Sequence, residues 1–352
     1  MPNKPSLPLD ELPDLPPRGV RLEDSSVLKK ALSTQRRLFQ LKEATAGFGN
    51  DTMLLNNLLP VELCEDLSPD QRIDFLARFF SAEARRYERE SVDIARAHRA
   101  RVAVVAAYRG IGEAKEPLDA IRELGAHITG VARPWRDHGV RAKPQSAVQP
   151  PNWVRAKMDN LLDYMVVQDD TEPLVRTVVL FYQFQAIAPF VTENERAARF
   201  FLALSLVREQ LLALPILHIN RLLTLEREAY TRRLHAVGAH GDWTAFIAFV
   251  LDIIDRGAIE TNRFIESHRV CLESISSVCR KLLPRVYTAE LIQALCERPY
   301  CRITDLVELG IAKRQTASAY LHELAAMGIL RMEKSGRDAL FVNTHLLEYL
   351  GR

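Results

Sequence analysis

The sequence predicts a mostly α-helical protein, on the basis of its composition, its hydrophobic spacing and its glycine placement. The chain has 352 residues, of which 47% are hydrophobic and 26% charged, a balance typical of folded globular proteins. Only 15 residues are glycine, and leucine, alanine and arginine, which favour helices, are common. At roughly 150 residues per domain, the length indicates about two domains.

The middle of the chain lacks glycine. No glycine occurs between Gly139 and Gly238. Phosphate-binding loops use glycine because its backbone reaches left-handed conformations and approaches phosphates closely. The pattern therefore excludes a glycine-built phosphate loop from this region.

The first part of the chain predicts an arm followed by helices. Residues 1–22 hold six of the 18 prolines, which favours an extended or disordered arm able to lie on the body. Apolar residues at helical spacing predict a helix over 26–46, ended by Gly47 and Gly49. Ser68-Pro69-Asp70 is a helix-start signal, and the arginines and acids of 70–109 indicate a solvated helical surface.

The glycines and prolines of 110–150 predict loops, with a short hairpin near 131–148. Beyond them the chain is strongly helical. The segment 173–187 is apolar on nearly every side, so we expect it to be the central buried helix. The helices expected after the loops cover 152–167, 173–187, 194–213, 216–236, 242–257 and 258–281.

The tail from about 285 differs from the rest. Short helices are expected at 289–297, 303–309 and 314–327, followed by an alternating segment over 329–342 with a turn at Ser335-Gly336. Three helices followed by strand, turn and strand are the layout of a winged helix-turn-helix. Its expected core is Ile303, Leu306, Val307, Ile311, Ala317, Leu321, Leu324 and Leu330.

Charge, cysteines and hydropathy restrict the function classes. The net charge of +2 neither demands nor forbids a nucleic-acid partner. The polar N-terminus and the lack of a long apolar run predict a cytoplasmic chain without membrane segments. The five cysteines are expected to be reduced. His268 and the four C-terminal cysteines lack the close Cys-x-x-Cys pair of a zinc site, so no metal is expected.

One segment resembles a known family signature. Residues 181–199 read FYQFQAIAPFVTENERAAR, which is similar to the Fic (Fido) signature His-Pro-Phe-x-(Asp/Glu)-Gly-Asn-Gly-Arg-x-x-Arg. Pro150-Pro151, the segment from Leu214 to Arg221 and Gly241-Asp242-Trp243 resemble the flanks of that family. The tail resembles the winged helix of many longer bacterial Fic proteins, so the resemblance covers 148–345 well and 26–46 weakly.

The resemblance implies an all-α fold: a Fic-like helical core with one small β-hairpin, plus a C-terminal winged helix-turn-helix. The target-docking hairpin of the family would fall near 133–147, where the role of the basic side chains stays open. The expected domains are a Pro-rich arm (1–22), an N-terminal helical segment (23–110), the Fic-like core (111–281) and the winged helix-turn-helix (285–352).

The signature is altered where the family does its chemistry. The resemblance places Ala188 where the family has its histidine base, and alanine cannot accept a proton. Thr192 replaces the acidic Mg²⁺ ligand and is a poor ligand for a hard dication. Glu193 and Glu195 replace the two glycines, which adds negative charge where a polyphosphate would lie.

Four signature residues remain: Phe190, Asn194, Arg196 and Arg199. Phe190 is expected to anchor the loop in the core. The resemblance makes Asn194, Arg196 and Arg199 the candidate nucleotide-binding residues. The two arginines could equally pair with the two glutamates, which is the interpretation that we favour.

The winged helix offers candidate DNA contacts. Arginine and glutamine suit the edges of guanine and adenine, and lysine suits phosphate. Packing or dimerisation without DNA is the alternative role of such a module. The candidate DNA-binding residues are Lys313, Arg314, Gln315, Ser318, His322, Arg331, Lys334 and Arg337.

The sequence therefore predicts a catalytically degenerate Fic-domain protein, a homodimer, that acts as a DNA-binding regulator or a protein-interaction module. It predicts no catalytic residue and no cofactor. The alternatives are an AMP (nucleotidyl) transferase with an altered active site, or a nucleotide-sensing pseudoenzyme. ATP and Mg²⁺ enter only under these alternatives.

Overall fold

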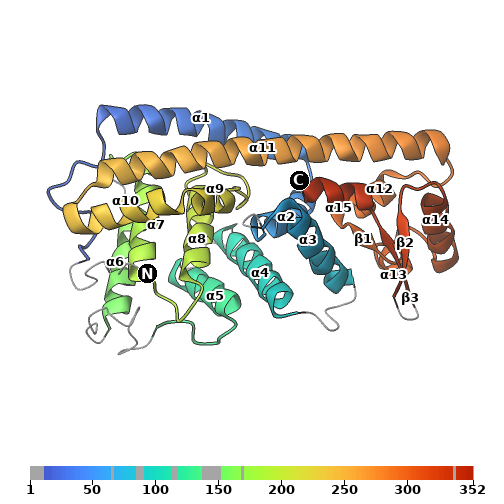
Figure 1. The fold of residues 1–352 in the computed structure, drawn as a ribbon, viewed down its shortest axis with the longest axis horizontal. Helices are drawn as coiled ribbons and strands as arrows, with labels where there is room; N and C mark the ends of the chain where they lie inside the picture. The colour runs from blue at the N-terminus through green and yellow to red at the C-terminus, as the bar shows by residue number, and fades with distance from the viewer. Residues whose placement is uncertain are drawn as a thin grey trace. The chain divides into compact units, whose positions relative to one another are not determined.

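A computed structural model describes residues 12–64, 67–84, 91–112, 117–136, 152–167, 170–335 and 338–351 (Figure 1). The described chain is mainly helical with one small sheet, so the predicted all-α class is confirmed. It forms two compact units. The first comprises residues 1–43 with 99–260, and the second comprises 44–98 with 261–352.

Unit 1 contains the altered signature. Its helices, three of which also contribute to unit 2, are α1 (Ser25–Phe48), α4 (Val92–Gly112), α5 (Pro117–Thr129), α6 (Trp153–Val166), α7 (Pro173–Ile187), α8 (Asn194–Arg208), α9 (Asn220–Leu225), α10 (Arg227–His240) and α11 (Trp243–Leu282).

Helix α7 forms the centre of unit 1, as its apolar sequence predicts. Pro173 occupies the first turn, where its missing N–H costs nothing, and the Glu172 side chain caps the helix by accepting a hydrogen bond from Val175 N. Of its residues, only Pro173 and Gln185 are not buried. Within this unit, Figure 1 shows α6 and α8 beside α7.

Two expectations for unit 1 were wrong. Residues 117–129 form a helix, because Ile121, Leu124 and Ile128 recur at helical spacing and bury one face. The helices expected at 242–257 and 258–281 are the single helix α11. Gly257 lies inside this helix and permits close packing, because a Cβ at this position would lie 2.6 Å from Ile219 Cγ2.

Other boundaries differ less. The stretch 70–109 forms α3 (Pro69–Ala84) and α4, and 216–236 forms α9 and α10, which meet at Glu226. The expected hairpin near 131–148 lies mostly outside the described residues. In its described part, Trp135 forms an isolated antiparallel bridge with Phe190.

Residues 12–15 of the Pro-rich arm lie on the body, as the composition of the arm allowed. Asn160 of α6 accepts a hydrogen bond from Leu15 N at 2.8 Å and donates to Leu15 O at 3.0 Å. Lys157 Nζ donates to Leu12 O at 2.6 Å, and Gln183 Nε2 of α7 donates to Pro13 O at 2.8 Å. Leu12 and Leu15 are buried.

Unit 2 combines helices with a three-stranded antiparallel sheet of order β1-β3-β2. The three tail helices and the two strands lie where the sequence predicted them, whereas α2, α15 and β1 were not predicted. Its elements besides α3 and the shared helices are α2 (Asp51–Glu62), α12 (Ala289–Glu297), β1 (Tyr300–Cys301), α13 (Ile303–Glu308), α14 (Arg314–Ala326), β2 (Arg331–Ser335), β3 (Asp338–Val342) and α15 (Thr344–Leu350).

The core of the tail agrees with the sequence except at one position. Leu306, Leu321 and Leu324 are fully buried, but Val307 is 40% exposed, because its neighbour Leu306 faces the core from the two-turn helix α13. Cys296 and Cys301 are buried, and burial raises the pKa of each thiol to about 12.

In the described part of the chain, no helix has the length and apolar composition to cross a membrane.

Candidate functional site

The signature loop joins α7 to α8 through a tight, cross-braced backbone. Ala188 ends α7 in the left-handed region, with φ 46°, and its N–H donates to Phe184 O at 3.0 Å. The Asn194 side chain accepts from Phe190 N and donates to Phe190 O, both at 2.8 Å. This pair of bonds fixes the loop across its own turn.

Phe190 anchors the loop in the core, as the sequence predicted. It is 1% exposed and lies with its ring centroid 5.9 Å from that of Phe184 and 5.5 Å from that of Trp135. Gly125 of α5 makes room for it, because a Cβ at Gly125 would lie 2.3 Å from the Phe190 ring. The glycine that suggested a loop is therefore a packing residue inside a helix.

The segment 134–136 braces the other side of the loop. Arg136 N donates to Pro189 O at 2.8 Å, and Val191 N donates to Pro134 O at 3.0 Å. The Arg136 guanidinium donates to Ile187 O at 2.9 Å and to Ala188 O at 3.2 Å. Burial lowers its pKa. Sequence reasoning left this arginine without a role; the structure makes it a positioning residue for the signature.

Glu193 occupies the turn before α8 in a glycine-like conformation. Its φ is 61°, a left-handed value that costs a non-glycine residue about 1–2 kcal/mol. Its carboxylate accepts from Arg196 Nη1 at 2.7 Å, and the side chains are 17% and 25% exposed. The two opposite charges lie at the N-terminus of α8, where backbone N–H groups favour an anion, and they neutralise each other there.

Glu195 and Arg199 have different surroundings from Glu193. Glu195 is exposed and lies 3.7 Å from Arg227 of α10, too weak a contact to hold either side chain. Among the described residues, no hydrogen-bond partner is found for the buried Arg199 Nε. Both glutamates thus lie near arginines, but Arg199 keeps a donor with no acceptor.

Tyr230 and Gln185 complete the surroundings of Arg199. Gln185 Nε2 donates to Tyr230 Oη at 2.9 Å, and burial raises the pKa of Tyr230, against a smaller lowering by Arg199. Neither residue was among the predicted site residues. The sequence held a signal that could have identified both residues. Tyr230 belongs to the segment after the signature, and Gln185 is the only polar, partly exposed residue late in α7.

The remaining signature positions offer little chemistry. Ala188 presents a methyl group where the family base would lie, and Thr192 is exposed at the tip of the loop. A threonine hydroxyl neither accepts a proton readily near neutral pH nor replaces a carboxylate on Mg²⁺.

The candidate DNA residues of the tail lie on one module but differ in availability. Lys313, Arg314 and Gln315 are exposed at the start of α14, where Ser318 is half-buried. His322 is exposed, with its ring edge-on to Phe341 at 5.2 Å. On β2, Lys334 is exposed and Arg331 is paired with Glu333 at 2.6 Å, whereas Arg337 lies outside the described residues.

Two family models match the chain. The Fic/DOC family model matches residues 115–206, which includes the altered signature. The chain contains a Fic/DOC-family domain. The model of the C-terminal domain of the SoFic-like protein adenylyltransferases matches residues 271–346, which covers most of the tail.

Solved structures of Fic proteins resemble this chain. A Fic family protein from Desulfovibrio desulfuricans is 16% identical, with a TM-score of 0.52, over 91% of this chain and 96% of that chain. A Fic domain containing signaling protein from Bacteroides thetaiotaomicron is 17% identical, with a TM-score of 0.46, over 68% of this chain and 95% of that one. At these identities the likeness concerns the fold, and the first match carries it.

Proposed function

We propose that this Fic-domain chain has lost AMP transfer and acts as a DNA-binding regulator through its C-terminal domain. The Glu193–Arg196 pair carries the first part of the proposal. In the family that the signature resembles, this turn and this arginine receive phosphates. Here the arginine is engaged by a carboxylate of the same loop.

The substitutions act together against catalysis. A positioned general base contributes about 10²–10⁴-fold to rate, and the Ala188 methyl supplies none of this. A second negative charge 4 Å from a phosphate costs about 1 kcal/mol even in water and more in a drier site. Glu193 is mostly shielded from solvent, so an incoming polyphosphate would have to displace it from Arg196.

The transfer proposal is tested by incubating the chain with labelled ATP, Mg²⁺ and a cell lysate. We expect no labelled protein above background, and an Arg196→Ala variant is the control for signature-dependent signal. Labelling that disappears in this variant would contradict the proposal and favour the altered-site transferase.

The start of α14 supports the DNA-binding part. Lys313, the N-cap residue, and Arg314 and Gln315 of the first turn are exposed in the region that such helices insert into the major groove. Arginine and glutamine pair in bidentate fashion with guanine and adenine, and Lys334 is a further exposed cation on β2. The pairing of Arg331 with Glu333 argues for a small set of contacts.

Electrophoretic shift of random duplex DNA at several salt concentrations tests this part. We expect binding at low salt that weakens as salt rises, and Lys313→Ala should reduce the logarithmic salt slope by about 1 per lost phosphate contact. Arg285→Ala, at an exposed arginine of the same unit, is the matched control. Equal binding by all three forms, or none, would leave the tail as a protein-interaction module.

Arg199 favours a second candidate, a nucleotide-sensing pseudoenzyme. Its buried Nε lacks an acceptor beside Tyr230, so an anion could satisfy it without any reaction. Calorimetry with ATP and Mg²⁺ separates the candidates. Micromolar binding that is lost in Arg199→Gln would support sensing, and undetectable binding would support the first candidate. Light scattering of the same sample tests the predicted homodimer.

A further inference from the structure

A cavity of about 160 Å³ lies beside the signature loop, within unit 1. Helix α5, the segment 135–136 and the start of α6 enclose it. Because one water takes about 30 Å³ in the liquid, the cavity has room for a small organic molecule. None of the candidate nucleotide-binding residues lines it.

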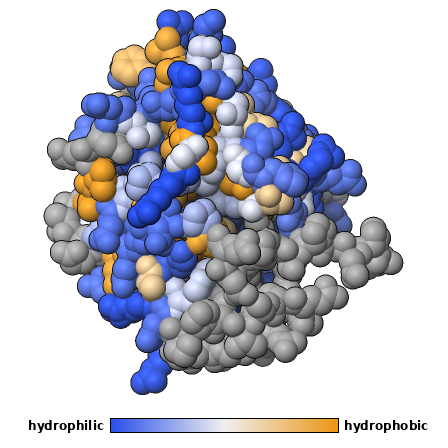
Figure 2. All heavy atoms as spheres, turned by 90° about the vertical axis from the view of Figure 1, so that its left-hand side faces the viewer, coloured by the Kyte–Doolittle hydropathy of each residue, from blue (hydrophilic) through white to orange (hydrophobic). Residues whose placement is uncertain are grey.

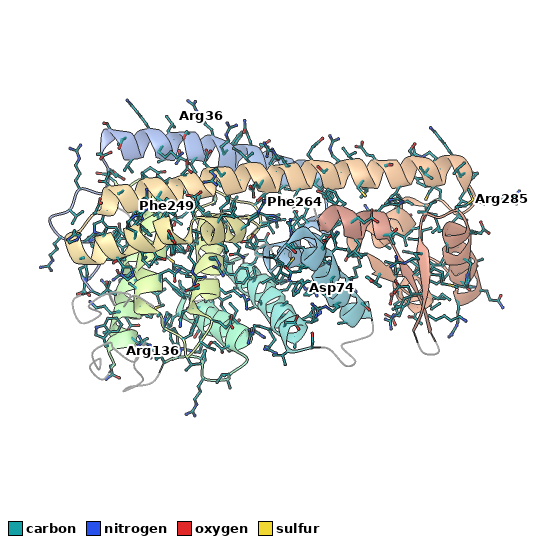
Figure 3. All side chains as sticks on the ribbon, viewed as in Figure 1. Arg36, Asp74, Arg136, Phe249, Phe264 and Arg285 are labelled. Atoms are coloured by element: carbon teal, nitrogen blue, oxygen red, sulfur yellow. The ribbon has the colours of Figure 1, made fainter. Side chains whose placement is uncertain are left out.

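Three arginines from three segments converge on the cavity. Arg122 of α5 is paired with Asp119 at 2.8 Å, and Arg155 of α6 lies 3.5 Å from Asp159. Both side chains are about half-exposed or more, so either can turn toward a ligand at little cost. Arg136, labelled in Figure 3, is 7% exposed and contributes the buried cation of the lining.

The rest of the lining is mainly apolar. Leu118, Trp135 and Met158 face the same space, and Met158 is 1% exposed. Of the acidic residues of the described chain, only Asp159 lines the cavity, against three guanidiniums. The lining therefore combines an excess of positive charge with an aromatic and aliphatic wall.

We propose that this cavity binds a small organic anion with a carboxylate or phosphate head and an apolar ring. The planar guanidinium matches both head groups through two parallel N–H donors. The ring would lie against Trp135 and Met158, where it buries apolar surface. A ligand without the charge or without the ring would fit only half of the lining.

The cavity is mechanically linked to the signature loop. Trp135 contacts Phe190 at a centroid distance of 5.5 Å, and Arg136 bonds the carbonyls of Ile187 and Ala188. A ligand that orders these two lining residues also orders the loop that they brace. This site is separate from the proposed functions and does not depend on either of them.

Calorimetry on the full chain with phenyl phosphate, benzoate, inorganic phosphate and benzyl alcohol tests the proposal. We expect saturable binding of phenyl phosphate or benzoate, with each of the other two probes at least tenfold weaker. Whichever aromatic anion binds more tightly identifies the head group. Arg122→Gln and Arg155→Gln should each weaken binding about tenfold, whereas Arg36→Gln, at an exposed arginine of α1, should not.

Amide hydrogen exchange locates the bound probe. The bound state should slow exchange at Arg136 and Val191, whose N–H groups bond the opposite segment. Three results of the calorimetry would overturn the proposal: no saturable binding by either aromatic anion, equal affinity for inorganic phosphate, or affinity unchanged in both lining variants. Protection elsewhere without protection at these amides would overturn it too.

Discussion

At the residue scale, the signature loop holds two non-glycine residues in the left-handed region, Ala188 and Glu193. Such conformations cost energy and persist only where the surroundings fix them. Here the Asn194 bonds to Phe190 and the Arg136 bonds to two carbonyls do so. These bonds therefore fix the shape of the loop.

Restoring glycine should reopen the turn to phosphates. We expect Glu193→Gly combined with Glu195→Gly to raise the affinity for ATP at least tenfold, because two negative charges and one side chain leave the start of α8. Calorimetry at constant salt measures this. Glu193→Gln is the partial control, since it removes one charge but keeps the side chain. Unchanged affinity in the double variant would contradict our account of the glutamates.

Gly125 should tolerate no side chain. We expect Gly125→Ala to destabilise the chain by about 1–3 kcal/mol, because its Cβ would overlap the Phe190 ring, which is fixed in the core. Urea unfolding measures the change. Gly47→Ala is the matched control, because nothing lies within 4 Å of a Cβ there, and it should be neutral or stabilising. Equal effects of the two substitutions would show that packing at Phe190 is not the cause.

At the element scale, His268 of α11 lies among other elements of unit 2. Its ring contacts Phe48 and Tyr349, its Nε2 lies 3.4 Å from Asn57 Nδ2, and it is 1% exposed. Burial lowers its pKa from 6.5 to about 4. The unfolded chain therefore takes up a proton near pH 6.5, before the folded chain does.

Acid should therefore weaken this packing. Stability linked to His268 is complete above pH 6.5 and is lost as the pH falls toward 4, by up to about 3 kcal/mol. Thermal unfolding between pH 7 and 4.5 measures it. His268→Phe should flatten the slope, whereas His345→Gln, at an exposed histidine, should not. A slope that is the same in all three forms would assign the acid sensitivity to other groups.

Side chains of helix α6 hold the Pro-rich arm on the body. Asn160→Ala removes both side-chain bonds to Leu15, so we expect Leu15 amide exchange to accelerate about tenfold with little change in global stability. Asp163→Ala, at an exposed residue of the same helix, is the control. No acceleration would mean that the burial of Leu12 and Leu15 and the bonds from Lys157 and Gln183 are enough to hold the arm.

At the scale of the whole molecule, one residue should not restore the activity of the family. We expect Ala188→His alone to give no AMP transfer, because Thr192, Glu193 and Glu195 would still oppose Mg²⁺ and phosphate. The matched variant adds Thr192→Glu, Glu193→Gly and Glu195→Gly. Labelling from ATP in the single variant would refute the view that the losses act together.

The sequence by itself determined the helical class, the buried α7, the order of the tail elements and the residues that differ from the Fic signature it resembles. These follow from local periodicity and from residue identity, both of which can be seen without a fold. The two wrong expectations for unit 1 came from glycine: Gly125 and Gly257 resemble helix breakers in sequence but act as packing residues.

Only the tertiary structure decided which partners those residues have. Arg196 pairs with Glu193, and Arg136 braces the loop from a distant segment. Arg199 Nε has no acceptor among the described residues near Tyr230. Contacts between residues far apart in the chain depend on how helices pack, and a single sequence carries no direct signal for them. The glycine gap predicted that this turn lacks a glycine-built phosphate loop, and the fold showed which side chains lie at the turn.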